Sequence, residues 1–387
     1  MSRLKFIIFT FFLWRILLFL PLLAAELFMR YRTEYAYTSI FNFTIPQFPL
    51  ASFLLHPWAN FDGLHYLFIA GNGYTNNFGF FPLYPILISA FSSLFGSEKP
   101  FEPQQFFSGF FISNIALFLS LFTFYKLLEI DYSKYEIKRS ILFLLLFPTA
   151  FFFASLYSES LFLLVTLLSF YFARQQKWFL AGIFAGLASL TRIVGIFLLP
   201  ALLYEFYREK TDSRHSGLSR ISLFSLFFPL VSLTSYAYLN FLKTGDWLYF
   251  IHAQGNFGNN RTVSSIVLFP QTVVRYGKIL LTLNPNQYEW LISLLELSTF
   301  FFASILLYIA WKKKVRTSYL VFSVLSFLLP VSTGTFTALP RYVLILFPIF
   351  IALGMVKHKW VQRIYVISSA IILFLLLMFF SKGYFVA

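Results

Sequence analysis

The chain alternates between long apolar runs and short polar segments, a pattern typical of membrane-spanning helices. Residues 80–95 form an apolar stretch too short for a comfortable span, and Pro82 and Pro85 favour a helix start along the membrane surface. The longer runs predict about eleven crossings, over residues 6–28, 104–128, 141–155, 159–174, 178–191, 193–207, 221–242, 290–311, 318–331, 341–356 and 362–380. Because a β-barrel would show segments of about ten alternating residues, we expect an all-α polytopic membrane protein.

Composition supports this fold class. Of the 387 residues, 59% are hydrophobic and 12% are charged, whereas about 25% are charged in typical soluble domains. Aromatic residues reach 22%, including 56 Phe and 23 Tyr, and such side chains suit lipid contact and the membrane interface. These values exclude a soluble enzyme and a disordered chain, and they predict one integral-membrane domain over residues 1–387.

The first apolar run follows Arg3 and Lys5 and continues to Phe28. A signal peptide is the alternative interpretation, with an apolar region of about 7–15 residues and a small-residue cleavage site. This run is longer, and Ala24-Ala25 is a weak site, so we favour an uncleaved first span.

The net charge of +15 would suggest a nucleic-acid partner in a soluble protein. In a membrane protein the positive-inside rule explains this charge. If the N-terminus is cytoplasmic and residues 80–95 do not cross the membrane, most of the 30 basic residues lie in cytoplasmic segments. We therefore expect no nucleic-acid partner. With this orientation, the segments predicted on the exoplasmic side are the 156–158 turn, the turn at Arg192, the C-terminus and the loops 30–103, 243–289 and 332–340.

The first exoplasmic loop contains Asp62 and, three residues later, His65. An aspartate in this position commonly caps a helix, here one beginning at Gly63, by accepting hydrogen bonds from the first turn. The alternative is chemical, since a carboxylate beside apolar surface can accept a proton from a bound hydroxyl. His65 shares the helical face of Asp62.

Glu159 and Arg192 are the next unusual residues. Glu159 opens a predicted helix, where the helix dipole favours an acidic residue. Arg192 lies in the middle of the apolar run 178–207, and an arginine placed there implies an anionic partner. That partner is either Glu159 or a bound phosphate, whose oxygens match the fork of the guanidinium group.

Several of these residues belong to short blocks that occur in one order and spacing over about residues 55–205, with one more late in the chain. The blocks comprise Asp62, His65-Tyr66-Leu67, Ala70, Gly73-Tyr74, Phe80-Phe81-Pro82, Pro85, Pro148, Phe152, Tyr157-Ser158-Glu159-Ser160-Leu161-Phe162, Arg192, Gly195 and Arg341-Tyr342. As a set they resemble the PIG-V family, mannosyltransferases that add the second mannose during GPI-anchor assembly. Phe61 replaces the usual Trp and Ile193-Val194 replaces Ser-Asn, and the compact chain is similar to bacterial-type relatives.

The resemblance implies a GT-C membrane glycosyltransferase whose first exoplasmic loop carries interfacial helices. It implies inverting transfer of a sugar, mannose in the family, from a polyprenyl-phosphate carrier to a glycolipid or glycan hydroxyl. The reaction would occur at the exoplasmic face of a bacterial inner (plasma) membrane, among membrane lipids. Asp62 would be the catalytic base and Arg192 the phosphate ligand, with further substrate contacts from His65, Tyr66, Glu159 and Arg341.

This scheme requires no metal or other cofactor. The chain has no Cys and only five His, none of them at the i, i+4 spacing of a helical metal pair, so a divalent cation has no support. A transporter or flippase of a lipid-linked sugar is the rival class and predicts inverted repeats and ionisable residues deep in discontinuous spans. We find no such repeat. A non-catalytic scaffold is a third interpretation, in which replacing Asp62 would have no effect.

Overall fold

The computed structural model describes residues 2–32, 53–97, 99–212, 220–257, 261–262 and 265–386, without the side chains of 209–212, 220–222, 256 and 257. Residues 33–52 of the predicted loop 30–103 therefore lie outside the described residues, as do short parts of the loop 243–289. Within the described part, helices are joined by turns, and one isolated bridge pairs Val267 with Thr333. The predicted all-α class is confirmed.

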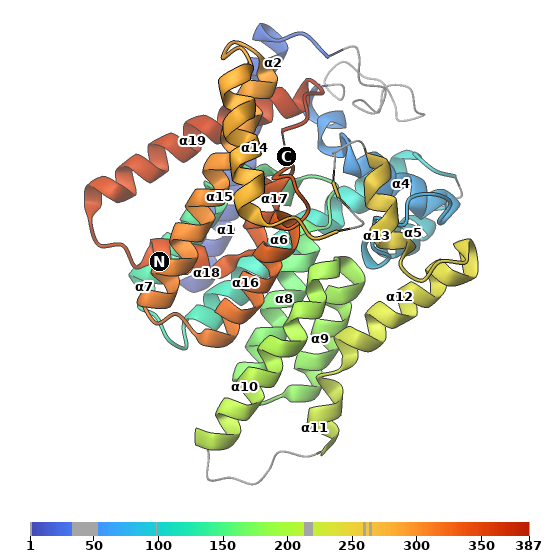
Figure 1. Cartoon of the computed structure of the whole chain (residues 1–387), viewed down its shortest axis with the longest axis vertical. Coiled ribbons are helices and arrows are strands. Elements are labelled where there is room, and N and C mark those ends of the chain that lie inside the picture. The colour runs from blue at the N-terminus through green and yellow to red at the C-terminus, as the bar shows by residue number, and fades with distance from the viewer. Residues whose placement is uncertain are drawn as a thin grey trace.

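Figure 1 colours the chain from its N-terminus to its C-terminus and labels the α-helices. The symbol η denotes a short 3-10 helix. The first half contains α1 (Arg3–Leu17), α2 (Phe19–Phe28), η2 (His56–Ala59), α4 (Asp62–Asn72), α5 (Leu83–Ser93), α6 (Pro103–Leu128), α7 (Lys134–Leu145), η3 (Ala150–Ala154), α8 (Glu159–Arg174), α9 (Trp178–Thr191), η4 (Ile193–Phe197) and α10 (Leu198–Asp212). The second half contains α11 (Arg220–Ser225), α12 (Phe228–Thr244), α13 (Tyr249–His252), η5 (Ala253–Phe257), α14 (Phe269–Thr282), α15 (Tyr288–Lys312), α16 (Thr317–Val331), α17 (Leu339–Tyr342), η6 (Val343–Ile345), α18 (Phe347–Gly354) and α19 (Lys359–Ser381).

Among the described residues, five helical segments are long and apolar enough to cross a membrane, namely Arg3–Phe28, Pro103–Leu128, Leu223–Thr244, Tyr288–Lys312 and Lys359–Ser381. The predicted count of eleven is not confirmed. The expected spans 141–155 and 193–207 are each divided between an α-helix and a 3-10 helix, and 341–356 is divided among α17, η6 and α18. Proline explains two of these breaks, because Pro148 and Pro348 disfavour continuation of a helix through the residues before them.

Several helix ends follow directly from local sequence. The expected helix within 80–95 begins at Leu83, immediately after Pro82, and α6 begins at Pro103. α7 begins with a capping box, in which the Ser133 hydroxyl accepts from the N–H of Glu136 and the Glu136 carboxylate accepts from the N–H of Ser133.

α8 lies at the centre of the molecule, between α6 and α9 (Figure 1). α9 in turn packs closely against its other neighbours because glycines occupy its surface. A Cβ atom at Gly182 would lie 2.1 Å from the carbonyl oxygen of Ser225, and one at Gly186 would lie 3.0 Å from the hydroxyl of Ser232. Small residues allow such backbone approach between membrane helices.

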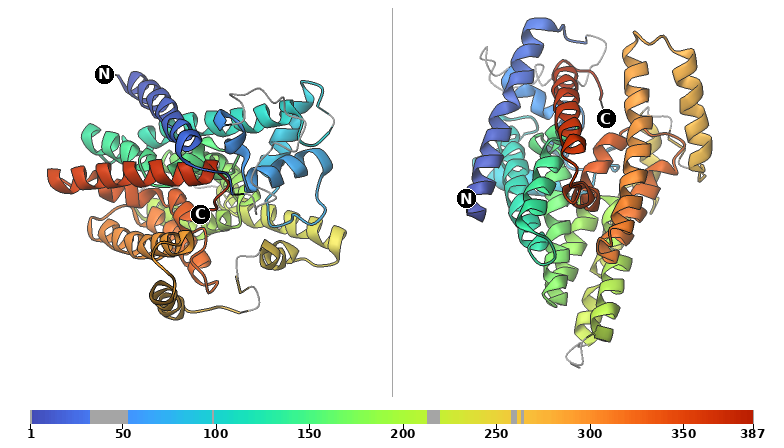
Figure 2. Two further views of the ribbon diagram at one scale, coloured as in Figure 1. Left: turned by 90° about the horizontal axis from the view of Figure 1, so that it is seen from above. Right: turned by 90° about the vertical axis from the view of Figure 1, so that its left-hand side faces the viewer.

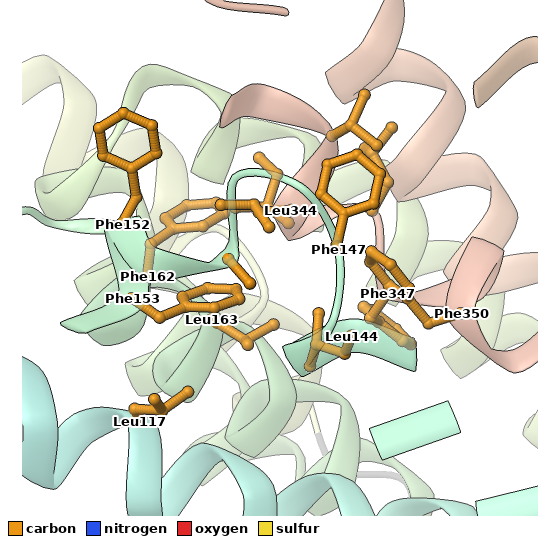
Figure 3. Packing of buried hydrophobic residues seen from close by; sticks show 14 of the residues in the cluster. Leu117, Leu144, Phe147, Phe152, Phe153, Phe162, Leu163, Leu344, Phe347 and Phe350 are labelled. Atoms are coloured by element: carbon orange, nitrogen blue, oxygen red, sulfur yellow. The ribbon is translucent and has the colours of Figure 1, made fainter. Parts of the chain in front are cut away.

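Phenylalanines fill the interior where the turn after α7 meets the segment η6–α18 (Figure 3). The rings of Phe147 and Phe350 lie 5.6 Å apart in an edge-to-face arrangement, while Phe152 and Phe162 pack on the other side of the turn. This packing holds η3 and η6 in place. Glu159 follows η3 and Arg341 precedes η6, so this packing also positions two residues of the pocket region described below.

The C-terminal end lies between the segment α1–α2 and the pair α14–α15 (Figure 2). The ammonium group of Lys382 pairs with Glu26 at 2.5 Å, and the carbonyl oxygen of Lys382 accepts from the N–H of Arg32. Phe380 and Phe385 contact the ring of Phe61, with centroids 5.6 and 5.3 Å away. The last helix therefore supports the residue that precedes Asp62.

Candidate active site

A pocket of about 1220 Å³ opens where α4, the turn after α9, the described residues 261, 262, 265 and 266, and α17 converge. Five of the six predicted site residues line it: Asp62, His65, Tyr66, Arg192 and Arg341. Glu159 lies behind the lining, where it contacts both arginines. The structure thus brings together residues from distant parts of the chain.

Asp62 is presented by a tight turn. Phe61 has φ 58° and ψ −111°, a conformation that non-glycine residues rarely adopt and that the surrounding packing must maintain. The Tyr157 hydroxyl braces the same turn by donating to the carbonyl oxygen of Asn60 at 2.8 Å and accepting from the N–H of Asp62 at 3.3 Å. The interpretation of Asp62 as a helix cap is wrong, because Phe61 occupies the cap position and no side chain caps α4.

The carboxylate of Asp62 instead binds Arg341. The Arg341 Nη1 atom donates to Asp62 Oδ2 at 2.5 Å, across 279 residues of chain. Asp62 Oδ1 makes no hydrogen bond among the described residues, and 22% of the side chain remains exposed. Arg341 therefore orients the carboxylate through one oxygen and leaves the other available to the pocket.

Arg341 is held by the turn that precedes it. Ala338 has φ 66°, and its N–H donates to Glu296 Oε1 at 3.3 Å. The other Glu296 oxygen accepts from the Tyr276 hydroxyl at 2.6 Å, and that hydroxyl accepts from the N–H of Phe336 at 3.0 Å. Glu296 and Tyr276 thereby fix a strained turn just before Arg341, a role that no sequence motif indicated.

Arg192 pairs with Glu159, the first of the two partners considered from the sequence. Its Nη1 atom lies 2.5 Å from Glu159 Oε1, and Arg341 Nε lies 3.4 Å from the same oxygen without hydrogen-bond geometry. Glu159 Oε2 is buried with no hydrogen-bond partner among the described residues. The backbone at Arg192 is extended between α9 and η4. The turn that follows requires a glycine at position 195, because a Cβ atom there would lie 2.4 Å from the carbonyl carbon of Ala188.

His65 and Tyr66 form the aromatic side of the pocket. The His65 ring stacks on Phe80 with centroids 4.7 Å apart, and the Tyr66 hydroxyl donates to Ser158 Oγ at 2.9 Å. Burial lowers the pKa of His65 below its ordinary value, against the opposing effect of the nearby Asp62 carboxylate. His65 is therefore neutral near pH 7 and adds no positive charge to the pocket.

Arg261 and Tyr342 complete the lining. The Arg261 Nη2 atom donates to the Tyr342 hydroxyl at 2.9 Å, and the guanidinium groups of Arg192, Arg261 and Arg341 lie 5.2, 5.6 and 5.7 Å from the Tyr342 ring centroid. Arg341-Tyr342 belonged to the family-like blocks. Arg261 was only one basic residue of a long loop, and no local signal distinguished it.

Among the described residues, no group of three or more His, Cys, Asp and Glu side chains is arranged to hold a metal ion. Asp62 and Glu159 each carry an arginine partner instead.

Residues 3–247 match the family model described as Mannosyltransferase (PIG-V). This chain belongs to the PIG-V mannosyltransferase family. The family is one of mannosyltransferases, and the long apolar helices of this chain support an integral membrane protein. The PIG-V match includes Asp62, Glu159 and Arg192, whereas Arg261 and Arg341 lie beyond its end.

No curated protein matches this PIG-V family member at a significant level. Among solved structures, the apo oligosaccharyltransferase of Archaeoglobus fulgidus is 13% identical, with 86% of this chain and 52% of that chain covered and a TM-score of 0.42. The same enzyme tethered with an acceptor peptide is 13% identical, with 96% and 55% covered and a TM-score of 0.43. The chain spans about half the length of these structures, and the likeness is too distant to bear on activity.

Proposed function

We propose that this protein transfers a sugar, with mannose as the family's sugar, from a polyprenyl-phosphate carrier to a hydroxyl of a glycolipid or glycan. One observation carries the proposal: a partly exposed carboxylate, Asp62, lies in a large pocket that three arginines also line. A base and an anion-binding surface are the two elements that displacement of a lipid phosphate by a hydroxyl requires.

The reaction proceeds as one inverting displacement. The acceptor oxygen attacks the anomeric carbon, the bond from that carbon to the phosphate oxygen breaks, and the polyprenyl phosphate leaves with both bonding electrons. Asp62 accepts the proton of the acceptor hydroxyl; the hydrogen bond from Arg341 to Oδ2 alone, which leaves Oδ1 unused, supports this role. The guanidinium groups stabilise the negative charge that develops on the phosphate oxygens.

We also propose that the pocket opens on the exoplasmic side. Most of its lining residues come from the loop 30–103, the turn at Arg192, the loop 243–289 and the segment 332–342, and a few come from α16, Ile345 and Phe385. Charge distribution alone assigned the first three and residues 332–340 to one side of the membrane. Their convergence on one pocket supports that topology.

Purified protein in lipid nanodiscs, given radiolabelled polyprenyl-phosphate mannose, glucose or arabinose and a bacterial lipid extract, tests the proposal. We expect transfer from one of these donors to a lipid or glycan product, and loss of that transfer in Asp62→Asn. Transfer at the wild-type rate by Asp62→Asn would refute the assigned base. Movement of the labelled lipid across proteoliposomes without any product would favour the flippase.

A further inference from the structure

The three arginines of the pocket differ in how their charge is balanced. Arg192 pairs with Glu159, and Arg341 pairs with Asp62. Arg261 makes no ion pair among the described residues. Its hydrogen-bond acceptors are all neutral, namely Gln254 Oε1 at 2.9 Å, the Tyr342 hydroxyl at 2.9 Å and the Thr337 carbonyl oxygen at 3.4 Å.

The backbone holds Arg261 firmly at the pocket wall. The N–H of Thr262 donates to the carbonyl oxygen of Thr333 at 2.9 Å, and that of Val267 donates to Ser332 at 3.0 Å. Thr262, the neighbour of Arg261, is thereby attached to the residues that follow α16. A guanidinium group that is oriented in advance loses little entropy when it binds an anion.

Electrostatics at Tyr342 show that negative charge is favoured at this place. Burial by itself raises the pKa of the Tyr342 phenol, but the positive charges of Arg261, Arg341 and Arg192 outweigh it and lower the pKa from 10.0 to about 8. Tyr342 belongs to the short helix α17, outside the five candidate spans. The phenol oxygen therefore marks a position where an anion gains from three cations.

We propose that Arg261 is the principal ligand of the donor phosphate, binding its oxygens beside the Tyr342 hydroxyl, while Arg192 and Arg341 serve mainly to hold Glu159 and Asp62. This proposal rests on the proposed function and moves the phosphate contact from Arg192, the residue that the sequence suggested. Incoming phosphate oxygens replace the neutral acceptors of Arg261. At Arg192 or Arg341 the phosphate oxygens would have to displace a carboxylate, which costs more free energy than displacing a neutral acceptor.

Arg261 could instead only brace the turn before Arg341 through Thr337. Arg275 provides a matched control, because its Nη1 atom donates to the Gly334 carbonyl oxygen at 3.2 Å in the same turn and Arg275 does not line the pocket. If bracing were the whole role, Arg261→Gln and Arg275→Gln would have similar effects.

Equilibrium binding to the nanodisc-embedded protein separates these roles without requiring turnover. The probes are a radiolabelled polyprenyl phosphate and the same polyprenol without phosphate. We expect Arg261→Gln to weaken binding of the phosphate about 10- to 100-fold, the loss of one charge-assisted contact, with polyprenol binding unchanged. Arg261→Lys should be intermediate, since it keeps the charge without the fork, and Arg275→Gln should match wild type.

Equal affinity of wild type and Arg261→Gln for the phosphate would overturn the proposal, as would equal losses in Arg261→Gln and Arg275→Gln. Absence of polyprenyl-phosphate binding by wild type would overturn it too. A similar effect of Arg261→Gln on binding of phosphatidylglycerol would assign the site to membrane lipid rather than to the donor. If wild type binds the phosphate through Arg261 but transfers no sugar, the proposed function fails and the ligand assignment stands.

Discussion

Helix α8 connects two ion-pair clusters built from the same residue types. At its first residue, Glu159 contacts Arg192 and Arg341. At its last residue, Arg174 pairs with Asp131 and lies 3.9 Å from Glu205. We refer to these as the pocket cluster, which also contains Asp62, and the closed cluster.

The closed cluster is saturated with hydrogen bonds. Glu205 is fully buried, and Arg316 Nε donates to both of its oxygens, at 2.7 and 3.0 Å. The Ser318 hydroxyl donates to Glu205 at 2.6 Å. Among the described residues, no side-chain atom of this cluster is buried without a partner, and none of its residues lines the pocket.

The pocket cluster is unsaturated by comparison. Glu159 Oε2 and Arg341 Nε are buried without hydrogen-bond partners among the described residues, and Asp62 keeps one oxygen open to the pocket. Such incomplete pairing costs free energy and persists where a site requires it. Buried charges alone therefore do not identify a candidate site; access to a pocket and unused hydrogen-bonding capacity distinguish the pocket cluster from the closed cluster.

The largest expected effect separates the two clusters by activity. Asp62→Asn should lower kcat for sugar transfer about 10²- to 10⁴-fold, because it removes the proposed general base. Asp131→Asn in the closed cluster should leave kcat close to wild type. Initial rates with saturating donor test both variants, and circular dichroism confirms that both remain folded. Equal rates in the two variants would contradict the proposal that the pocket cluster, and not the closed cluster, takes part in the reaction.

The second prediction concerns stability. Glu205→Gln removes the carboxylate that balances Arg316 and should destabilise the protein by about 3–5 kcal/mol, the usual cost of leaving a buried charge unpaired. Glu159→Gln should destabilise it less, because Arg192 and Arg341 face the pocket and Asp62 remains nearby. Unfolding by SDS in mixed micelles measures both values. A larger loss in Glu159→Gln would reverse the assigned roles.

The smallest effect is a pH dependence of donor binding. The pKa of Tyr342 is lowered to about 8 by the guanidinium groups of Arg261, Arg341 and Arg192, which outweigh the effect of burial. Above that pH the phenolate offsets part of their charge, so affinity for polyprenyl phosphate should fall by up to about tenfold per pH unit. His65, with its lowered pKa, is already neutral in this range.

Binding measured from about pH 7 to 9.5 tests this dependence, with Tyr342→Phe as the comparison variant. The phenylalanine variant should lose most of the decline, since it has no proton to release. An unchanged slope in Tyr342→Phe would show that another group titrates.

Local features of this fold were predictable from sequence, whereas long-range ones were not. Pro82 and the turn at Arg192 indicated helix boundaries because prolines and polar breaks act on their immediate neighbours. The family resemblance, rather than any local pattern, grouped the six candidate site residues, of which five line the pocket and Glu159 lies behind its lining. Three predicted spans were wrong as single helices, because apolar composition does not reveal a 3-10 turn. Arg261 was missed because its position depends on a fold partner, Thr333, more than 70 residues away.

The separation of 279 residues between Asp62 and Arg341 has a consequence for biogenesis. During translation, α4 is synthesised long before α17, so the Asp62 carboxylate initially lacks its Arg341 partner. The aromatic support of Phe61 by Phe380 comes later still. A ribosome-bound chain that ends before these segments would hold its first helices without a working site. The ion pair between Asp62 and Arg341 thus forms only when the last helices have been made, so the pocket is completed at the end of synthesis.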